Sequence, residues 1–287
     1  MKKIALACGL GLMSLLSPPL FAADRACVAG KGHVDKEVSG FRVSIAPAAS
    51  AEHQGECRAE VLSAAGAVIF EAHGAEAAMN PISGKDVDGD GTPDVVLETV
   101  SGNALHYAVV SLAEPPGLRR ELSVSVPLHF EDLDADGRVE IWARDYAFRD
   151  FDGLPAAASP APRVVFRLKG ATLVHVSQAF WSEYEKEIVE ARGLISKDTL
   201  DDFLAIPTQG DEDRKPKEIG PAEQAKITDL KGIVLEIVLA NLYGGRGQEA
   251  WKALDQMWPA TDRPRIRQMI LKARTSGILS EINRPKK

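Results

Sequence analysis

The chain lacks a hydrophobic run long enough to cross a membrane. The apolar stretch from Ile4 to Leu16 is too short for a transmembrane helix, which needs about 20 apolar residues. The stretch from Ile233 to Tyr243 is roughly half that length and contains Glu236. We therefore expect no transmembrane segment in the mature chain, and we expect Ile233 to Tyr243 to form a buried helix.

The signature motifs of two large enzyme groups are also missing. The six histidines are scattered, without the H-E-x-x-H pair of zinc proteases, and the sequence has no G-x-S-x-G turn of the α/β-hydrolase type. The run from Gly245 to Ala250 matches a G-x-G-x-x-A phosphate turn in letters only, because a helical pattern precedes it where that turn requires a strand. These absences favour a binding or structural role over catalysis.

Cysteine is scarce, with three residues in the 287 of the chain. Cys8 lies in the N-terminal apolar stretch, which leaves Cys27 and Cys57 for the mature protein. An even number of cysteines in an exported chain most often forms disulfides. We predict a Cys27–Cys57 disulfide, which would contribute about 3 kcal/mol by constraining the unfolded chain. The alternative is a pair of buried free thiols.

The N-terminus has the layout of a secretory signal peptide. Lys2 and Lys3 form a short positive region, the apolar stretch follows, and small residues end it near Ala22–Ala23. The pattern predicts a signal peptide over residues 1–22 and a periplasmic or secreted product. Without the two lysines the chain keeps 32 basic and 41 acidic residues, a net charge of about −9. An acidic exported protein is poorly suited to nucleic acid, so we expect no nucleic-acid partner.

Hydrophobic periodicity divides the chain into two parts. From residue 41 to residue 177 apolar and polar residues alternate, as in FRVSIAP, DVVLETV and RVVFRLK, which indicates half-buried strands. Beyond residue 177 the period is helical, with Phe180, Tyr184 and Ile188 on one face. We expect a β-rich domain over 23–177, a helical connector over 178–206, a polar linker over 207–221 and a helical domain over 222–287, with helices at 222–243, 248–258 and 262–282.

Two acidic loops in the β-rich region share one spacing. Counting the first aspartate as position 1, each loop has carboxylates at positions 1, 3, 5 and 9 and glycine at position 6. The carboxylates are Asp86, Asp88, Asp90 and Asp94 in the first loop, and Asp132, Asp134, Asp136 and Glu140 in the second. Calcium prefers six to eight oxygen ligands, many of them carboxylates. Carboxylates so close together would repel one another in the absence of a cation.

The loops do not fit an EF-hand. That motif needs a glutamate at position 12 and a helix on each side, whereas position 12 is Leu97 in one loop and Ala143 in the other, and both loops lead into strand patterns. The spacing and the strand context instead resemble the FG-GAP/VCBS repeat family, whose calcium loops lie on integrin-α-like β-propeller blades. The resemblance implies a calcium ion held in each loop by the four carboxylates and by the backbone carbonyl at position 7, from Thr92 or Arg138.

The strand region is too small for the complete propeller of that family. A closed propeller needs at least four four-stranded blades, and the sequence supplies roughly nine strands and only two clear loops; a third candidate, from Asp150 to Gly153, is too degenerate. We therefore expect an α+β protein in which blade-like antiparallel hairpins form an open N-terminal β domain, followed by a C-terminal helical domain. The expected function is calcium-dependent binding of a protein or glycan, or a structural role. The alternative is an extracytoplasmic hydrolase acting on a polymer.

Overall fold

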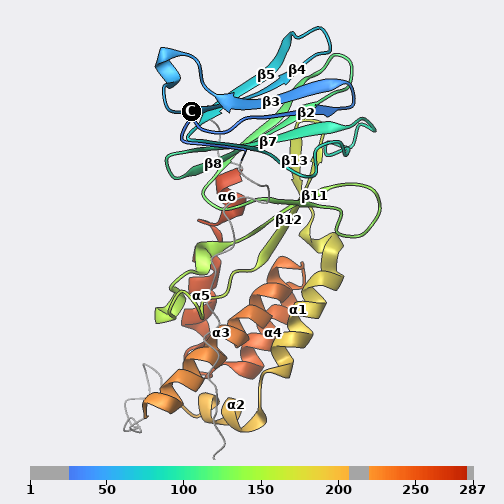
Figure 1. Cartoon of the computed structure of the whole chain (residues 1–287). Coiled ribbons are helices and arrows are strands. Elements are labelled where there is room, and N and C mark those ends of the chain that lie inside the picture. Colours follow the sequence, from blue (N-terminus) through green and yellow to red (C-terminus); the bar gives the residue numbers. More distant parts are fainter. Residues whose placement is uncertain (1–25, 207–219, 283–287) are drawn as a thin grey trace, which may run out of the picture.

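The computed structural model describes residues 26–206 and 220–282 and confirms an α+β fold with open antiparallel sheets (Figure 1). The expected signal peptide over 1–22, most of the expected linker over 207–221 and the last five residues lie outside the described residues. Within the described ranges the strands precede the main helices in the chain, as the change of periodicity predicts.

The strands form three sheets, each built around a four-stranded meander in which sequence neighbours pair antiparallel. The first sheet contains β2 (Val34–Val38), β3 (Phe41–Pro47), β4 (Cys57–Leu62) and β5 (Val68–Gly74). The second has the order β1 (Cys27–Val28), β6 (Glu76–Met79), β7 (Asp94–Ser101), β8 (Ala104–Ser111) and β9 (Gly117–Val124). The third contains β10 (His129–Glu131), β11 (Glu140–Arg144), β12 (Arg163–Lys169) and β13 (Thr172–His175). No sheet closes on itself among the described residues, which confirms the expected open structure.

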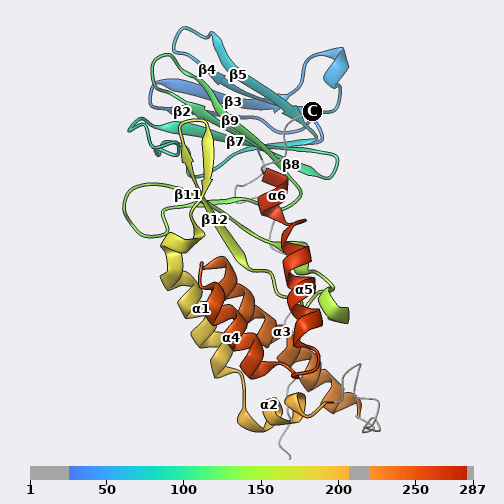
Figure 2. The same ribbon diagram turned by 180° about the vertical axis from the view of Figure 1, so that it is seen from behind.

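The second sheet is covered on both faces, because its central strands carry apolar side chains on both faces. Successive side chains of a strand point to opposite faces, so Val95 and Leu97 of β7 pack against the first sheet, while Val96 packs into a second core on the other face. That second core is continuous with the third sheet and the helices. The first sheet therefore lies over one face of the second, and the third sheet and helices lie on the side of its other face (Figures 1 and 2).

One helix, whose second half is mostly apolar, lies among the other helices. Helix α3 (Pro221–Tyr243) is buried on most sides in its second half, and it packs against α1 (Trp181–Gly193) and α4 (Gly247–Met257). Pro221 stands at its first turn, where a missing N–H costs no hydrogen bond. The remaining helical segments are η1 (Ala51–His53), η2 (Tyr146–Phe148), η3 (Phe151–Gly153), η4 (Ser177–Phe180), α2 (Lys197–Leu204), α5 (Arg263–Arg274) and α6 (Ile278–Ile282).

The expected single helix over 262–282 is wrong, because helix α5 ends at Arg274 and a separate helix, α6, begins at Ile278. The buried carboxylate of Asp145 lies at the break. It accepts a 2.7 Å hydrogen bond from the Tyr243 hydroxyl, and the backbone N–H of Ile278 lies 3.4 Å from its other oxygen. A Cβ at Gly277 would lie 2.2 Å from this carboxylate, so only glycine fits there. The break lets α6 reach β9, where Glu281 accepts hydrogen bonds from Ser125.

The degenerate third motif, from Asp150 to Gly153, is part of the helical packing. Asp152 forms ion pairs with Lys231 of α3 and Arg265 of α5, each at 2.6 Å. These cations hold the pKa of Asp152 below its usual value against the opposing effect of burial. The segment therefore contacts two helices through Asp152.

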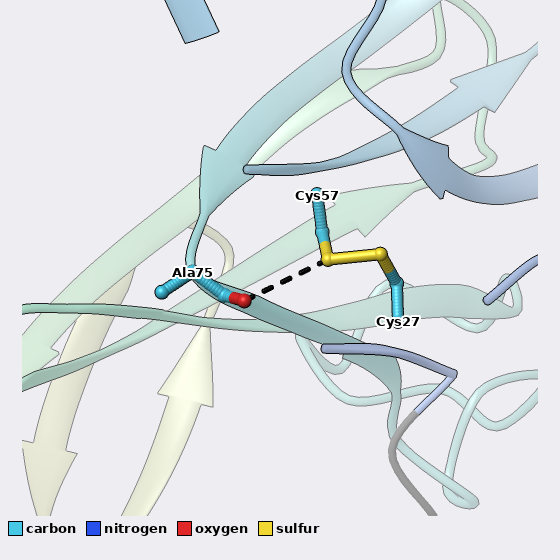
Figure 3. The surroundings of a disulfide bond; sticks show 3 residues. All are labelled: Cys27, Cys57 and Ala75. Carbon is cyan, nitrogen blue, oxygen red and sulfur yellow. Dashed lines mark hydrogen bonds between the residues drawn. A yellow bond between two sulfur atoms is a disulfide. The ribbon is translucent and has the colours of Figure 1, made fainter. Parts of the chain in front are cut away.

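The predicted disulfide joins Cys27 and Cys57, with Cα atoms 5.9 Å apart (Figure 3). It ties β1 at the edge of the second sheet to β4 of the first sheet, and both cysteines are buried in the core between these sheets. The dashed line in Figure 3 joins Cys57 Sγ to the carbonyl of Ala75 at 3.7 Å. Because an oxidised sulfur carries no proton, this is a packing contact rather than a hydrogen bond.

Replacing Gly277 with alanine tests the break between α5 and α6. We expect G277A to lower the free energy of unfolding by about 1–3 kcal/mol, because the new methyl group would displace the Asp145 carboxylate. Urea denaturation followed by circular dichroism measures the change. The matched control is G193A, at the end of α1, where an added Cβ would meet open space. Equal unfolding free energies for the two variants would contradict the role given to Asp145.

Candidate metal centre

The two acidic loops occupy the same place in two of the meanders. The first loop (residues 86–94) lies in the connection between β6 and β7, and the second (residues 132–140) in the connection between β10 and β11. Each connection joins the first two strands of a four-stranded meander, and position 9 of each loop is the first residue of the second strand. The first sheet has only a two-residue turn, Ser39-Gly40, at its corresponding connection.

The backbones of the two loops follow the same path. Positions 4 and 6 have positive φ in both: 80° and 85° at Gly89 and Gly91, and 57° and 84° at Ala135 and Gly137. Glycine adopts this conformation without steric cost, which explains its place at position 6. Ala135 adopts it at a cost, which indicates that the surrounding loop imposes the conformation.

Three hydrogen bonds recur in both loops and explain the acidic spacing. The N–H at position 6 donates to the carboxylate at position 1, over 2.8 Å in the first loop and 3.0 Å in the second. The N–H at position 7 donates to position 5, over 2.8 and 2.9 Å. The N–H at position 2 donates to position 9, over 2.7 and 2.9 Å. The carboxylates at positions 1, 5 and 9 therefore fold both loops by accepting backbone N–H groups, whereas the carboxylate at position 3 does so only in the first loop, where Asp88 accepts from the Asp90 N–H at 3.0 Å.

The carboxylates at positions 1, 3 and 5 converge in both loops. One oxygen each from Asp86, Asp88 and Asp90 lie within 4.8 Å of one another, and the same holds for Asp132, Asp134 and Asp136. The first cluster is partly enclosed, because Asp88 is buried, while all three aspartates of the second are exposed. Burial is the main cause that raises the pKa of Asp88. The first loop thus concentrates negative charge where water solvates it poorly.

Position 9 of the first loop has an unsatisfied buried oxygen. Asp94 is fully buried, and its Oδ2 accepts hydrogen bonds from the N–H groups of Val87 and Asp88. Its Oδ1 has no hydrogen-bond partner among the described residues. Burial, with the nearby Asp88 carboxylate, raises the pKa of Asp94 to about 7. A buried carboxylate oxygen without a donor is costly, and either a proton or a cation would satisfy it.

The corresponding oxygen in the second loop has a partner. Glu140 is fully buried like Asp94, but its Oε1 accepts a hydrogen bond from Arg167 Nε of β12. The same guanidinium donates to Asp134 at 3.1 Å and to Asp136 at 2.9 Å. Arg167 therefore supplies one positive charge to three of the four carboxylates. Burial still raises the pKa of Glu140, against the lowering effect of Arg167.

In the first loop, Arg119 of β9 takes the place of Arg167, but its contacts are weaker. Its Nε lies 3.2 Å from Asp88 Oδ2, and its Nη2 lies 3.8 Å from Asp90 Oδ2. The Ser111 hydroxyl also donates to Asp90, at 3.2 Å. Arg119 does not hydrogen-bond Asp94. The two loops thus share a backbone and differ in how far an arginine neutralises them.

The predicted carbonyl ligands stand at position 7 of each loop. Thr92 is partly exposed and Arg138 is exposed. Each donates its own N–H to the position 5 carboxylate, which fixes the peptide unit on its N-terminal side. That their carbonyls bind an ion stays a prediction.

The first loop borders a cleft beside the third sheet. Its volume is about 320 Å³, and Asp86, Asp88, Arg138, Arg167 and Lys169 are among the lining residues. The N–H of Gly170, in the turn between β12 and β13, donates to the carbonyl of Asp88 at 2.9 Å. Residues of both acidic loops therefore face one cleft that carries carboxylates and cations together.

The arginines were not predictable from the loop motifs. Arg119 lies 31 residues beyond Asp88, and Arg167 lies 27 residues beyond Glu140. The alternation of apolar and polar residues in their strands predicts which side chains are exposed, but it does not predict which loop an exposed arginine contacts. Nor does any sequence motif indicate the group formed by His53, Glu56 and His73. No short spacing in the sequence unites those three residues, because β-sheet pairing brings His73 to the other two.

Comparison with known proteins identifies no similar protein. No family model, curated protein or solved structure matches the chain. A search of the described helices for a span both long and apolar enough to cross a membrane finds none.

A buried glutamate near the first loop predicts a pH dependence of stability. Glu98 of β7 accepts a hydrogen bond from Asn80, which also caps the start of the loop connection through its bond to the Ile82 N–H. Burial raises the pKa of Glu98 to about 7. Because the folded-state pKa lies above the unfolded value, this carboxyl stabilises the fold at low pH, and that contribution is lost as pH rises through 7.

We expect E98Q to reduce the stability difference between pH 5 and pH 8, measured in chelator, by on the order of 2–3 kcal/mol. Glutamine keeps the acceptor for Asn80 and cannot ionise. Urea denaturation at the two pH values measures the difference. E185Q, at an exposed position of α1, should leave it unchanged. An undiminished pH dependence in E98Q would show that Glu98 does not titrate near neutral pH in the folded protein.

Proposed function

We propose that this chain is an exported calcium-binding β-module with a helical C-terminal part, and that it binds a protein or a glycan or has a structural role. The observation that carries the proposal is the first loop, where the carboxylates of Asp86, Asp88 and Asp90 converge. Asp94, at the end of the same loop, is buried and has one oxygen without a hydrogen-bond donor among the described residues. A cation held by the three aspartates would neutralise the cluster, including the charges of Asp88 and Asp86 that help to raise the pKa of Asp94.

The donor chemistry favours calcium over other ions. All ligating side chains in both loops are carboxylates, which suit hard cations. Magnesium demands near-ideal octahedral geometry and keeps several waters, whereas calcium accepts irregular sets of six to eight oxygens. The place of both loops in the first connection of a four-stranded meander supports the resemblance to FG-GAP/VCBS blade repeats. The disulfide supports an oxidising, extracytoplasmic location.

The two loops differ in the competition that calcium would meet. In the second loop calcium must displace Arg167 from three carboxylates, whereas in the first it must displace only the weaker contacts of Arg119. We therefore assign the tighter calcium site to the first loop.

The variant D88N tests calcium binding at the first loop. The wild-type chain should gain about 2.7 kcal/mol of stability when free calcium is 100-fold above its dissociation constant. D88N should lose most of the gain that belongs to this loop, because one charged ligand becomes neutral. Thermal unfolding in chelator and in calcium measures the gain. The control D201N removes an exposed carboxylate on α2 and should keep it. Equal destabilisation of D88N with and without calcium would show that Asp88 serves only the fold.

The variant R167Q tests the competition in the second loop. We expect calcium to bind the second loop at least about tenfold more tightly in R167Q, since its cationic competitor is removed, while the chain in chelator becomes less stable. Isothermal titration calorimetry with calcium measures both sites. The companion variant R119Q should strengthen the first site instead. Unchanged calcium affinity in R167Q would contradict the competition.

A further inference from the structure

A second kind of ligand cluster lies in the first sheet, which carries neither acidic loop. His53 ends η1, Glu56 directly precedes β4, and His73 lies in β5. One nitrogen or oxygen from each of these side chains lies within 4.8 Å of the other two. His53 Nδ1 and Glu56 Oε2 are 2.8 Å apart, and the two imidazole rings have centroids 3.8 Å apart. All three side chains are partly exposed, so an ion could reach them from solvent.

The backbone holds these three residues in place. The N–H of Glu56 donates to the carbonyl of His53 at 3.0 Å, and the N–H of Ala48 donates to the carbonyl of Glu56 at 2.9 Å. The next residue, Cys57, is tied to β1 by the disulfide. His73 is paired with Arg58 in the β4–β5 ladder. The main chain that carries the cluster is therefore fixed before any ion binds, which lowers the cost of ordering a site.

One imidazole nitrogen in the cluster is not committed to a hydrogen bond. His73 Nε2 is buried and has no hydrogen-bond partner among the described residues, although Glu71 Oε1 lies 3.2 Å away. Histidines that bind metals commonly direct their second ring nitrogen to a carboxylate, and Glu71 is a carboxylate close to this nitrogen.

We propose that His53, Glu56 and His73 form a binding site for a transition-metal ion of the zinc class. Two imidazoles and one carboxylate are ligands that zinc accepts at about 2.0–2.2 Å, with water in the fourth position of a tetrahedron. Calcium prefers a set made of oxygens alone. The nitrogen ligands therefore separate this site from the acidic loops, and the protein would bind two chemically different ions at different places.

Zinc titration of the purified full-length chain in the presence of saturating calcium tests the site. This choice rests on the proposed function, in which calcium fills the carboxylate loops, so that zinc binding then reports the nitrogen ligands. Competition with a chromogenic chelator measures stoichiometry and affinity, and cobalt absorption reports the coordination geometry. We expect one zinc ion per chain, with affinity reduced at least about 100-fold in H73A and in H53A and more modestly in E56Q. The control H33A removes an exposed histidine that contacts Asp35 at 2.9 Å and should bind like the wild type.

Each outcome decides for or against the site. Loss in H53A and H73A with H33A unchanged supports it, provided that the metal-free variants melt at the wild-type temperature; if one variant does not fold, E56Q and the cobalt spectrum of the wild type decide. No stoichiometric zinc in the wild type overturns the proposal. Retained affinity in both histidine variants overturns it as well. Displacement of the zinc by excess calcium would assign it to the acidic loops and also overturn the proposal.

Discussion

The crowding of carboxylates in the first acidic loop is the constraint on which the account depends. Four acidic side chains are needed to fold a short connection, because each accepts a backbone N–H of the loop. The same spacing brings negative charges together and leaves one oxygen of Asp94 buried without a donor. The carboxylates therefore fold the loop, and they also leave it with crowded negative charge and an unsatisfied buried oxygen. In the proposed function, a bound cation offsets this negative charge.

The strands on either side determine how deeply each of the two acidic loops is buried. Each acidic loop ends on the first residue of a strand that lies inside a sheet, so position 9 is buried in both loops. Positions 1 and 5 are at least partly exposed in both loops, while position 3 is buried in the first loop and exposed in the second. The strand neighbouring in space then decides what else each loop meets: Arg167 reaches deep into the second loop, while Arg119 stops short of Asp94 in the first. The two loops therefore share a backbone path and differ in how far an arginine neutralises their carboxylates. The helical part stabilises the sheets from one side through Asp145, Asp152 and Glu281.

Much of the fold follows from local patterns in the sequence. Alternation in segments such as DVVLETV predicts strands, and the shift to a helical stripe at Phe180 predicts the helices. The disulfide follows from the count of cysteines. The break at Gly277 could not be predicted, because it depends on Asp145, more than 130 residues away in the chain. For the same reason the loop spacing predicts the carboxylate clusters but neither their arginine partners nor the group of His53, Glu56 and His73, which strand pairing assembles.

Anomalous X-ray diffraction from crystals of the protein grown in calcium tests the central claim most directly. The account predicts an anomalous peak in the first loop, with oxygens of Asp86, Asp88, Asp90 and Asp94 at 2.3–2.6 Å from it and with Arg119 turned away from Asp88. The second loop should show a weaker peak or keep Arg167 in place. A first loop without a peak at saturating calcium, with its carboxylates directed apart into solvent, would contradict the account.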